Sequence, residues 1–174
     1  MNPRELVDYI RNGPTELVLD EPLRFRRRTR SNPCDFNEFL QALQCSETIR
    51  AIDCRSQLQL GVTEDEWVLL VKTLGSIKGI ERLSMMPSSR DFRPFQAVAE
   101  AVNNAHSLRK LEVGVEDVTF PRDPFGLIEL ANSLRKHTAL QEFRWAELCS
   151  RLEAAQITAI DPVLQALIAC PHLR

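Results

Sequence analysis

This chain of 174 residues contains few aromatic residues and few glycines, and it has no large excess of charge of either sign. It has two Trp, one Tyr and six Gly, and its 22 basic and 24 acidic side chains leave a net charge of -2. A nearly neutral chain lacks the strong field that attracts nucleic acid or an anionic membrane surface. The hydrophobic fraction of 44% is nevertheless ordinary, so the composition predicts a folded globular domain rather than a disordered segment.

Long apolar runs and paired cysteines are also missing. Nowhere do 18 apolar residues stand together, so we expect no membrane-spanning helix, and the first residues form no signal peptide. The cysteines are odd in number and form no C-x-x-C pair, which disfavours a disulfide framework. They are Cys34, Cys45, Cys54, Cys149 and Cys170. These absences predict a reduced, soluble protein of the cytoplasm.

The motifs of common enzyme classes are absent as well. The sequence has no G-x-S-x-G, no glycine-rich phosphate loop and no H-E-x-x-H. Three carboxylates, Glu64, Asp65 and Glu66, follow Thr63 in a pattern typical of the start of a helix. Thr is a favourable N-cap, and the helix dipole stabilises negative charge there. We therefore interpret these carboxylates as helix-capping groups, and we expect no catalytic residue, no cofactor and no small-molecule substrate.

The sequence does contain an internal repeat. Five segments place apolar residues at an anchor position and, where the sequence extends far enough, three and five residues later. The anchors are Ile49, Ile80, Leu108, Leu140 and Leu173. Apolar residues also recur 13, 10, 9 and 6 positions before each anchor, which follows the period of a helix with one buried face. Offsets +3 and +5 follow the two-residue period of a strand. Each unit is therefore predicted to be a helix, a short turn and a short strand.

One further column of the repeat holds small residues. Seven positions before each anchor stand Ala42, Thr73, Ala101, Ser133 and Ala166. Small residues are expected where a helix must lie close against a sheet. This column supports the helix–strand unit independently of the apolar pattern.

The repeat resembles a known family. The pattern L-x-x-L-x-L after a helix, in units of 28 to 33 residues, is similar to the leucine-rich repeats of the ribonuclease-inhibitor type, and Leu130–Phe143 carries it most clearly. The resemblance covers residues 36–174. It implies an α/β solenoid, a fragment of a right-handed horseshoe with a parallel sheet on its concave side and helices on its convex side. The family's Asn or Cys at offset +8 is missing, so the units are irregular; those positions hold Gln57, Ser88, Glu116 and Leu148.

The first 35 residues are predicted to be an N-terminal cap. A solenoid buries each repeat only against its neighbours, so its end must be covered. Pro3 favours the start of a helix and Gly13 its end, which predicts a helix over residues 3–12, followed by a strand over Glu16–Leu19. Residues 36–174 then hold about four and a half repeats. Because the last unit is cut at Arg174, we expect the repeats to continue in a longer protein.

Three histidines, His106, His137 and His172, fall in the expected helix-to-strand turns. A zinc site could be imagined there, but the spacings of the three histidines match no zinc-ligand pattern. No carboxylate stands at the corresponding positions of the repeat either. We interpret all three as solvated turn residues and expect no metal.

The strands offer a candidate binding surface. If offsets +3 and +5 point inward, then +2, +4 and +6 point outward onto the concave face. The candidate partner-binding residues there are Asp53, Arg55, Arg82, Lys110, Glu112, Glu142 and Arg144. In-register parallel strands would place Lys110 beside Glu142, and Glu112 beside Arg144, where opposite charges attract. A face of mixed sign suits a protein partner better than nucleic acid. A solvated face kept soluble by mixed charge is the alternative.

One run of charge stands out between residues 24 and 30. Its members are Arg24, Arg26, Arg27, Arg28 and Arg30. Such a run indicates a nuclear-import signal or a patch for an anionic partner, with a solvated loop as the alternative. The single aromatic neighbour, Phe25, gives little support for base stacking.

These observations and the family resemblance predict a non-enzymatic scaffold that binds a protein partner through its concave face and loops. The alternatives are a nuclear or nucleic-acid-associated scaffold that uses the arginine run, and a regulatory subunit of an enzyme. The expected location is the cytoplasm, with the nucleus as the alternative if the arginine run acts as an import signal.

Overall fold

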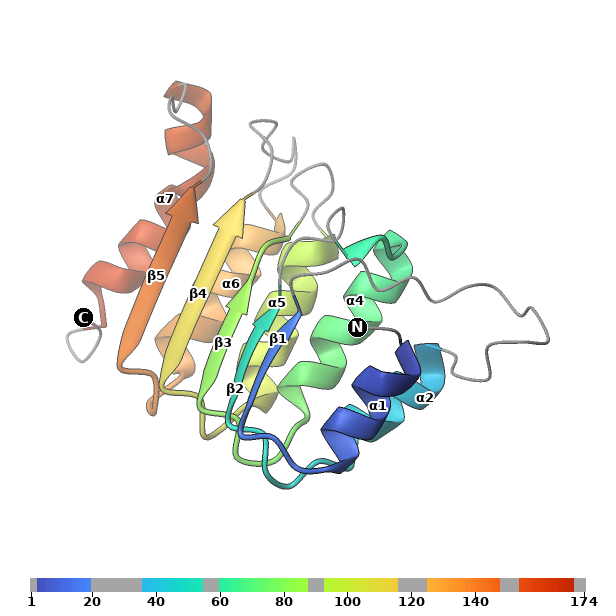
Figure 1. The fold of residues 1–174 in the computed structure, drawn as a ribbon. Coiled ribbons are helices and arrows are strands. Elements are labelled where there is room, and N and C mark those ends of the chain that lie inside the picture. Colours follow the sequence, from blue (N-terminus) through green and yellow to red (C-terminus); the bar gives the residue numbers. More distant parts are fainter. Residues whose placement is uncertain are drawn as a thin grey trace.

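Helices and strands alternate along the chain. The computed structural model describes residues 3–19, 36–54, 60–87, 93–115, 125–147 and 154–170. Its elements are α1 (Pro3–Arg11), β1 (Glu16–Leu19), α2 (Phe36–Gln44), β2 (Ala51–Cys54), α4 (Glu64–Gly75), β3 (Arg82–Met85), α5 (Arg93–Asn104), β4 (Lys110–Val115), α6 (Phe125–Lys136), β5 (Glu142–Glu147) and α7 (Ala154–Ile168). The strands lie side by side in one sheet, and α4, α5 and α6 lie behind it (Figure 1). The predicted order of helix and strand in each unit is confirmed.

The sheet is parallel throughout. Within the described residues it has five strands in chain order, β1-β2-β3-β4-β5. Neighbouring units pair in register, so that the residues two positions after each anchor form one row across the sheet. That row contains Ala51, Arg82, Lys110 and Glu142. β1 extends it by pairing Glu16 with Ala51. The predicted strand register is confirmed.

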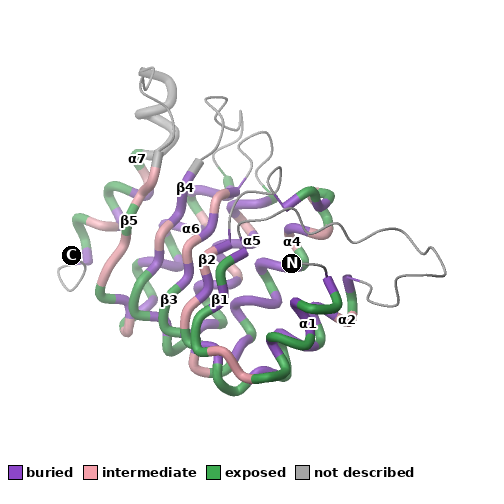
Figure 2. The backbone as a smooth tube through the Cα atoms, viewed as in Figure 1, coloured by how far each residue is buried: buried purple, intermediate pink, exposed green. Residues whose placement is uncertain are grey.

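The core lies between the sheet and the helices. The inward strand residues Ile52, Leu83 and Leu111 are all buried, and so are the residues two positions after each of them. Figure 2 shows this burial continuing along the helix sides that face the sheet. The alternation of buried and accessible residues along β2, β3 and β4 follows the two-residue period of a strand. The offsets +3 and +5 therefore point inward, as predicted.

Small residues let neighbouring helices approach closely. A Cβ atom added at Gly75 of α4 would lie 2.4 Å from the Cα of Ala101 in α5, too close for any side chain. Ala101 belongs to the predicted small column, so here that column lies against the preceding helix as well as behind the sheet. Thr73 and Ser133 are buried in the same column, and their hydroxyls donate to the carbonyls of Leu69 and Glu129. This satisfies polar groups that would otherwise be costly to bury.

The start of α4 has the predicted capping arrangement. The Thr63 hydroxyl accepts a hydrogen bond from the Glu66 backbone N–H at 3.2 Å. The Glu66 carboxylate accepts one from the Thr63 N–H at 2.7 Å. These reciprocal bonds satisfy backbone donors that the first helical turn leaves unpaired. Glu64 and Asp65 form ion pairs with Arg93 of α5. The interpretation of these carboxylates as groups of the helix start is confirmed.

The N-terminal elements occupy the predicted positions. α1 ends at Arg11, one residue before the predicted end, and β1 has the predicted bounds. Leu17 and Leu19 are buried in the same core as the later strands. The division of the chain into a cap over residues 1–35 and repeats over residues 36–174 stays a prediction.

Candidate functional site

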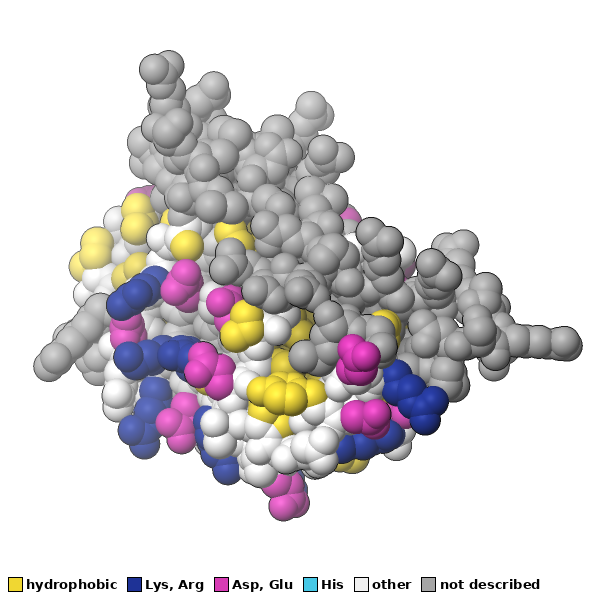
Figure 3. All heavy atoms as spheres, viewed as in Figure 1, with side chains coloured by type: hydrophobic (Ala, Val, Ile, Leu, Met, Phe, Trp, Pro, Cys, Tyr) yellow, Lys and Arg dark blue, Asp and Glu magenta, His cyan; other side chains and the backbone are white. Residues whose placement is uncertain are grey.

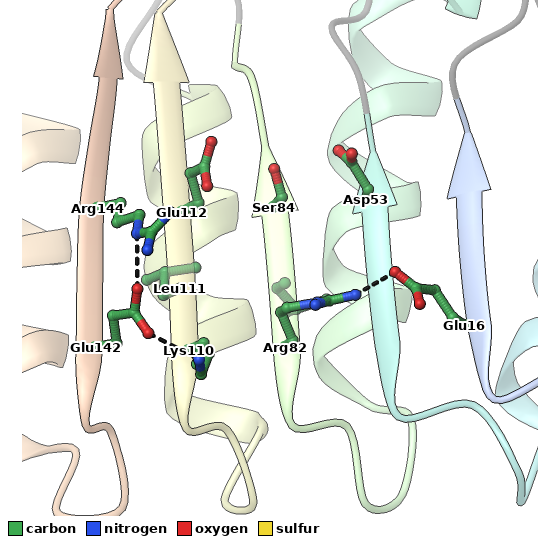
Figure 4. A pocket seen from close by; sticks show the side chains of 10 residues that line it. Glu16, Asp53, Arg82, Ser84, Lys110, Leu111, Glu112, Glu142 and Arg144 are labelled. Carbon is green, nitrogen blue, oxygen red and sulfur yellow. Dashed lines mark hydrogen bonds and ion pairs between the residues drawn. The ribbon is translucent and has the colours of Figure 1, made fainter.

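The candidate site is the face of the sheet opposite the helices, called the open face below. Two rows of side chains project from it. The lower row is Glu16, Ala51, Arg82, Lys110 and Glu142, and the upper row is Val18, Asp53, Ser84, Glu112 and Arg144. Most of these side chains line one open hollow of about 380 Å³ (Figure 4). Basic and acidic groups alternate on this face where it is visible in Figure 3.

One ion pair spans two strand intervals. Arg82 of β3 reaches over β2 and pairs with Glu16 of β1 (Figure 4). The residue it passes in the same row is Ala51, whose methyl group leaves the path clear. The pair fixes the direction of the Arg82 guanidinium, although exposed pairs of this kind contribute little to stability.

A second group of charges lies over β4 and β5. The Lys110 ammonium lies 2.9 Å from one Glu142 carboxylate oxygen, as the register predicts. The Arg144 guanidinium lies 2.6 Å from the other oxygen of the same carboxylate. The predicted placement of Glu112 beside Arg144 is confirmed by the register, but the ion pair of Arg144 is with Glu142. Glu142 and Arg144 are two residues apart on β5, so their side chains project from the same face of the sheet. The Glu142 carboxylate can therefore bind Arg144 and Lys110 at the same time.

The two cations shift the titration of Glu142. The hydrogen bond from Lys110, with further contributions from Arg144, lowers the pKa of Glu142 below its ordinary value of 4.5 against an opposing effect of desolvation. Both cations favour the ionised carboxylate. The Glu142 side chain is therefore a fixed negative charge at neutral pH, shared by two positive ones.

Two carboxylates on the open face are not neutralised in this way. Asp53 on β2 and Glu112 on β4 lie on either side of Ser84 in the upper row, and Figure 4 shows both projecting from the sheet. Neither has an ion pair with any residue that the structure describes. The middle of the hollow is consequently acidic, while its lower row is largely self-neutralised.

The structure brings most of the predicted partner-binding residues together. Asp53, Arg82, Lys110, Glu112, Glu142 and Arg144 line the hollow. Arg55 and the run from Arg24 to Arg30 lie outside the described residues. Sequence reasoning missed Glu16 and Ser84 as members of the site. Glu16 could have been found by extending the +2 column into the first strand, where Leu17 and Leu19 have the two-residue spacing of the +3 and +5 positions.

His137 departs from the prediction of a solvated turn residue. It is buried, with its Nε2 atom 2.9 Å from the Ala105 carbonyl oxygen, and its Nδ1 accepts the Leu140 N–H at 3.1 Å. Its ring therefore satisfies backbone groups of two successive units. His106 is exposed, as predicted, and His172 lies outside the described residues.

The described residues lack the features of two other classes of site. No group of three His, Cys, Asp or Glu side chains in them is placed to hold a metal ion. No helix in the same part of the chain is long and apolar enough to cross a membrane.

Comparisons with known proteins identify the fold. No protein-family model and no curated protein matches the sequence. Among solved structures, the chain is similar to leiomodin-1 actin-binding site 2, with 15% identity and a TM-score of 0.60, over 95% of this chain and 87% of that one. It is also similar to the tropomodulin C-terminal domain of Caenorhabditis elegans, with 11% identity and a TM-score of 0.52, over 97% and 93% of the two chains.

These similarities define the class of fold and no more. The neighbours are domains of the leucine-rich-repeat kind with a parallel sheet, and this chain has the same α/β architecture. The predicted fold class is therefore confirmed. The narrower assignment to the ribonuclease-inhibitor type stays a prediction.

Proposed function

We propose that this chain is a non-enzymatic protein-binding module that docks a protein partner on its open face. The supporting observation is that charged side chains of both signs line a hollow on the sheet, and no described element covers them. Charges of both signs, some of them held in place by ion pairs, favour a protein whose surface carries the complementary pattern of charge. They disfavour proteins that place like charges against them. Nucleic acid, which presents one sign of charge, fits this face poorly.

The pattern of free and neutralised charge defines the partner's chemistry. Arg82, Lys110 and Arg144 are each engaged with a carboxylate of this chain. Asp53 and Glu112 have no such cation among the described residues, and Ser84 between them leaves room above the sheet. The partner accordingly presents a Lys or Arg side chain over Ser84, where two carboxylates can accept its hydrogen bonds.

Co-purification with matched variants tests this proposal. The open-face variant is Asp53→Asn with Glu112→Gln, and the control, Asp65→Asn with Glu100→Gln, removes the same charge from the helix side. Proteins that copurify with the native chain and the control, and are depleted with the open-face variant, are the expected result. If every bound protein is retained equally by both variants, the open face is not the binding surface.

A second candidate function is actin binding. It is favoured by the structural similarity to leiomodin-1 actin-binding site 2, which extends over 95% of the length of this chain. Cosedimentation with filamentous actin, together with fluorescence titration of monomeric actin, would detect it. Binding that the open-face variant weakens would join the two proposals, whereas no binding to either form of actin would reject this candidate and leave the first one standing.

A further inference from the structure

A third row of the open face, two residues beyond the row of Ser84, is apolar. It holds Met86 directly after β3, Gly114 on β4 and Ala146 on β5. Figure 3 shows hydrophobic side chains beside charged ones on this face of the molecule. The third row therefore offers a partner a kind of contact that the two charged rows do not.

Gly114 lets the Met86 side chain lie across the sheet. A Cβ atom added at Gly114 would lie 3.0 Å from Cγ and 3.1 Å from Cε of Met86, so the methionine occupies the space that a side chain of β4 would take. Gly114 is buried, whereas Met86 is partly exposed. A thioether side chain is flexible and adapts to the surface that it meets. Met86 thus forms an apolar surface over β3 and β4, called the Met86 shelf below.

The Met86 shelf lies in line with the acidic middle of the hollow. Ser84 and Met86 are two residues apart and project from the same face, so they are about 6.6 Å apart along the direction of β3. Asp53 and Glu112 stand on either side of Ser84, on β2 and β4 (Figure 4). A segment that docks along β3 therefore meets negative charge over Ser84 and an apolar surface over Met86.

Two ion pairs keep the path along β3 clear of long side chains. Arg82 extends from β3 toward Glu16 of β1, and Lys110 pairs with Glu142 of β5. Figure 4 shows that these two pairs lie on opposite sides of the middle of the hollow. The surface above β3 is consequently open to a partner between them.

An α-helix fits this arrangement better than an extended segment. Residues four apart on a helix share one face and are about 6.0 Å apart along its axis, close to the spacing of Ser84 and Met86. Asp53 and Glu112 come from strands two intervals apart, about 9.6 Å, which is near the width of a helix. An extended segment has a similar repeat, but its N–H and C=O groups would be buried against a sheet whose backbone is already paired. A helix satisfies its backbone groups internally.

We infer that the protein partner contributes an amphipathic helix that lies along β3. This helix presents Lys or Arg over Ser84 and a large apolar residue, four positions away, on the Met86 shelf. The inference rests on the proposed function, because the open face must first be the docking surface. The cation donates hydrogen bonds to Asp53 and Glu112, and the apolar side chain removes the Met86 thioether from water. The spacing of the two contacts distinguishes this helix from other basic surfaces.

Methionine-methyl NMR tests the inference, and the chain contains its own control. Its three methionines are Met1, Met85 and Met86. Met85 is buried in the core, whereas Met86 lies on the open face. The probes are stapled helical peptides of about 15 residues that carry one Lys and one Leu four positions apart, in either order, because the helix can run in either direction along β3. At least one of them is expected to shift the Met86 methyl resonance and leave that of Met85 in place.

Two matched peptides test the pattern itself. One carries Lys and Leu two positions apart, which suits an extended segment and separates the two side chains on a helix. The other carries Glu in place of Lys. Both are expected to bind at least about tenfold more weakly, as the loss of a charge-assisted contact predicts. Tighter binding of the first would show that an extended segment is preferred, and equal binding of the second would show that charge plays no part. Either result overturns the inference.

Matched protein variants assign the two contacts. Asp53→Asn with Glu112→Gln is expected to weaken the Lys–Leu peptide about tenfold. Met86→Ala is expected to weaken it about fivefold, and to leave unchanged a peptide in which Ala replaces the Leu. Leu69→Ala, which removes an exposed apolar side chain from the helix side, is expected to bind like the native chain. Circular dichroism checks that each variant folds, and peptide binding that Met86→Ala and the charge variant both leave unchanged overturns the inference.

Failure of this inference can be told apart from failure of the proposed function. If no peptide shifts the Met86 methyl resonance at about 1 mM, the helix is rejected as the docking element. The proposed function still stands in that case if the copurifying proteins depend on Asp53 and Glu112. If those proteins are also retained equally by the open-face variant and its control, both proposals fail.

Discussion

The Nε2 atom of His137 lies 2.9 Å from the carbonyl oxygen of Ala105, which occupies the equivalent turn of the preceding repeat. On the other side of the ring, Nδ1 accepts the Leu140 N–H. An imidazole that accepts at Nδ1 must carry its proton at Nε2 in order to donate to a carbonyl. The ring thus joins two successive helix-to-strand turns through backbone groups that it satisfies.

Replacing His137 should destabilise the fold. His137→Ala removes two hydrogen bonds and leaves the buried N–H of Leu140 unsatisfied, although the Ala105 carbonyl still accepts the Leu108 N–H, so we expect the free energy of unfolding to fall by about 1–3 kcal/mol. His106→Ala, which changes an exposed residue of the preceding turn, should cost less than about 0.5 kcal/mol. Urea denaturation of both variants checks this. Equal losses would show that burial of His137 contributes nothing specific.

Adjacent residues of β4 should respond very differently to truncation. Leu111 is buried, and Leu111→Ala should lower the free energy of unfolding by roughly 2–5 kcal/mol, as truncations of buried leucine do. Lys110 projects from the open face, and Lys110→Ala should change stability by less than about 0.5 kcal/mol. The comparison is made by chemical denaturation. A larger loss at Lys110 than at Leu111 would mean that the strand register is wrong.

The charge group on β4 and β5 should give stability a dependence on pH. Because the folded-state pKa of Glu142 lies below its ordinary value of 4.5, its ionised form stabilises the fold above that pH. This contribution is lost as the pH falls through the lowered folded-state pKa. Native chain and Glu142→Gln should therefore differ in unfolding free energy at pH 7 and converge in acid. A difference that persists unchanged in acid would contradict the assignment.

The cysteines should differ sharply in reactivity. Burial raises the pKa of the Cys54 thiol to about 12, with a further contribution from Asp53, so the thiol stays protonated and inaccessible at pH 8. Cys45 is free and exposed. Iodoacetamide labelling followed by peptide mass spectrometry should find Cys45 modified in the folded protein and Cys54 modified only after unfolding. Labelling of both at the same rate in native buffer would show that the core around Cys54 is open.

The repeat pattern was sufficient to predict the sheet. Ile52, Leu83 and Leu111 stand at the same offset from successive anchors, and equal strand offsets require an in-register parallel sheet. The row that places Lys110 beside Glu142 follows directly from that register. The sequence also located the N-cap at Thr63, because capping is a local interaction between residues three apart.

Side-chain choices within the site were less predictable. From its position on β5, Arg144 can reach the carboxylates of both Glu112 and Glu142. The repeat pattern does not indicate which of the two it pairs with. His137 lies in a segment whose sequence is typical of a polar turn. Its burial depends on a carbonyl supplied by another repeat, 32 residues away. The reach of Arg82 to Glu16 depends on Ala51 being small, a relation among three strands rather than two.

The most direct test of the open face as the binding surface is photo-crosslinking from Ser84, at the middle of the hollow. A benzophenone amino acid is placed at Ser84 in one variant and at Lys72, on the helix side, in another. Crosslinks from Ser84 to a protein whose modified peptide contains Lys or Arg near the attachment point, and none to that protein from Lys72, are the predicted result. A partner that crosslinks from Lys72 and never from Ser84 would contradict the account.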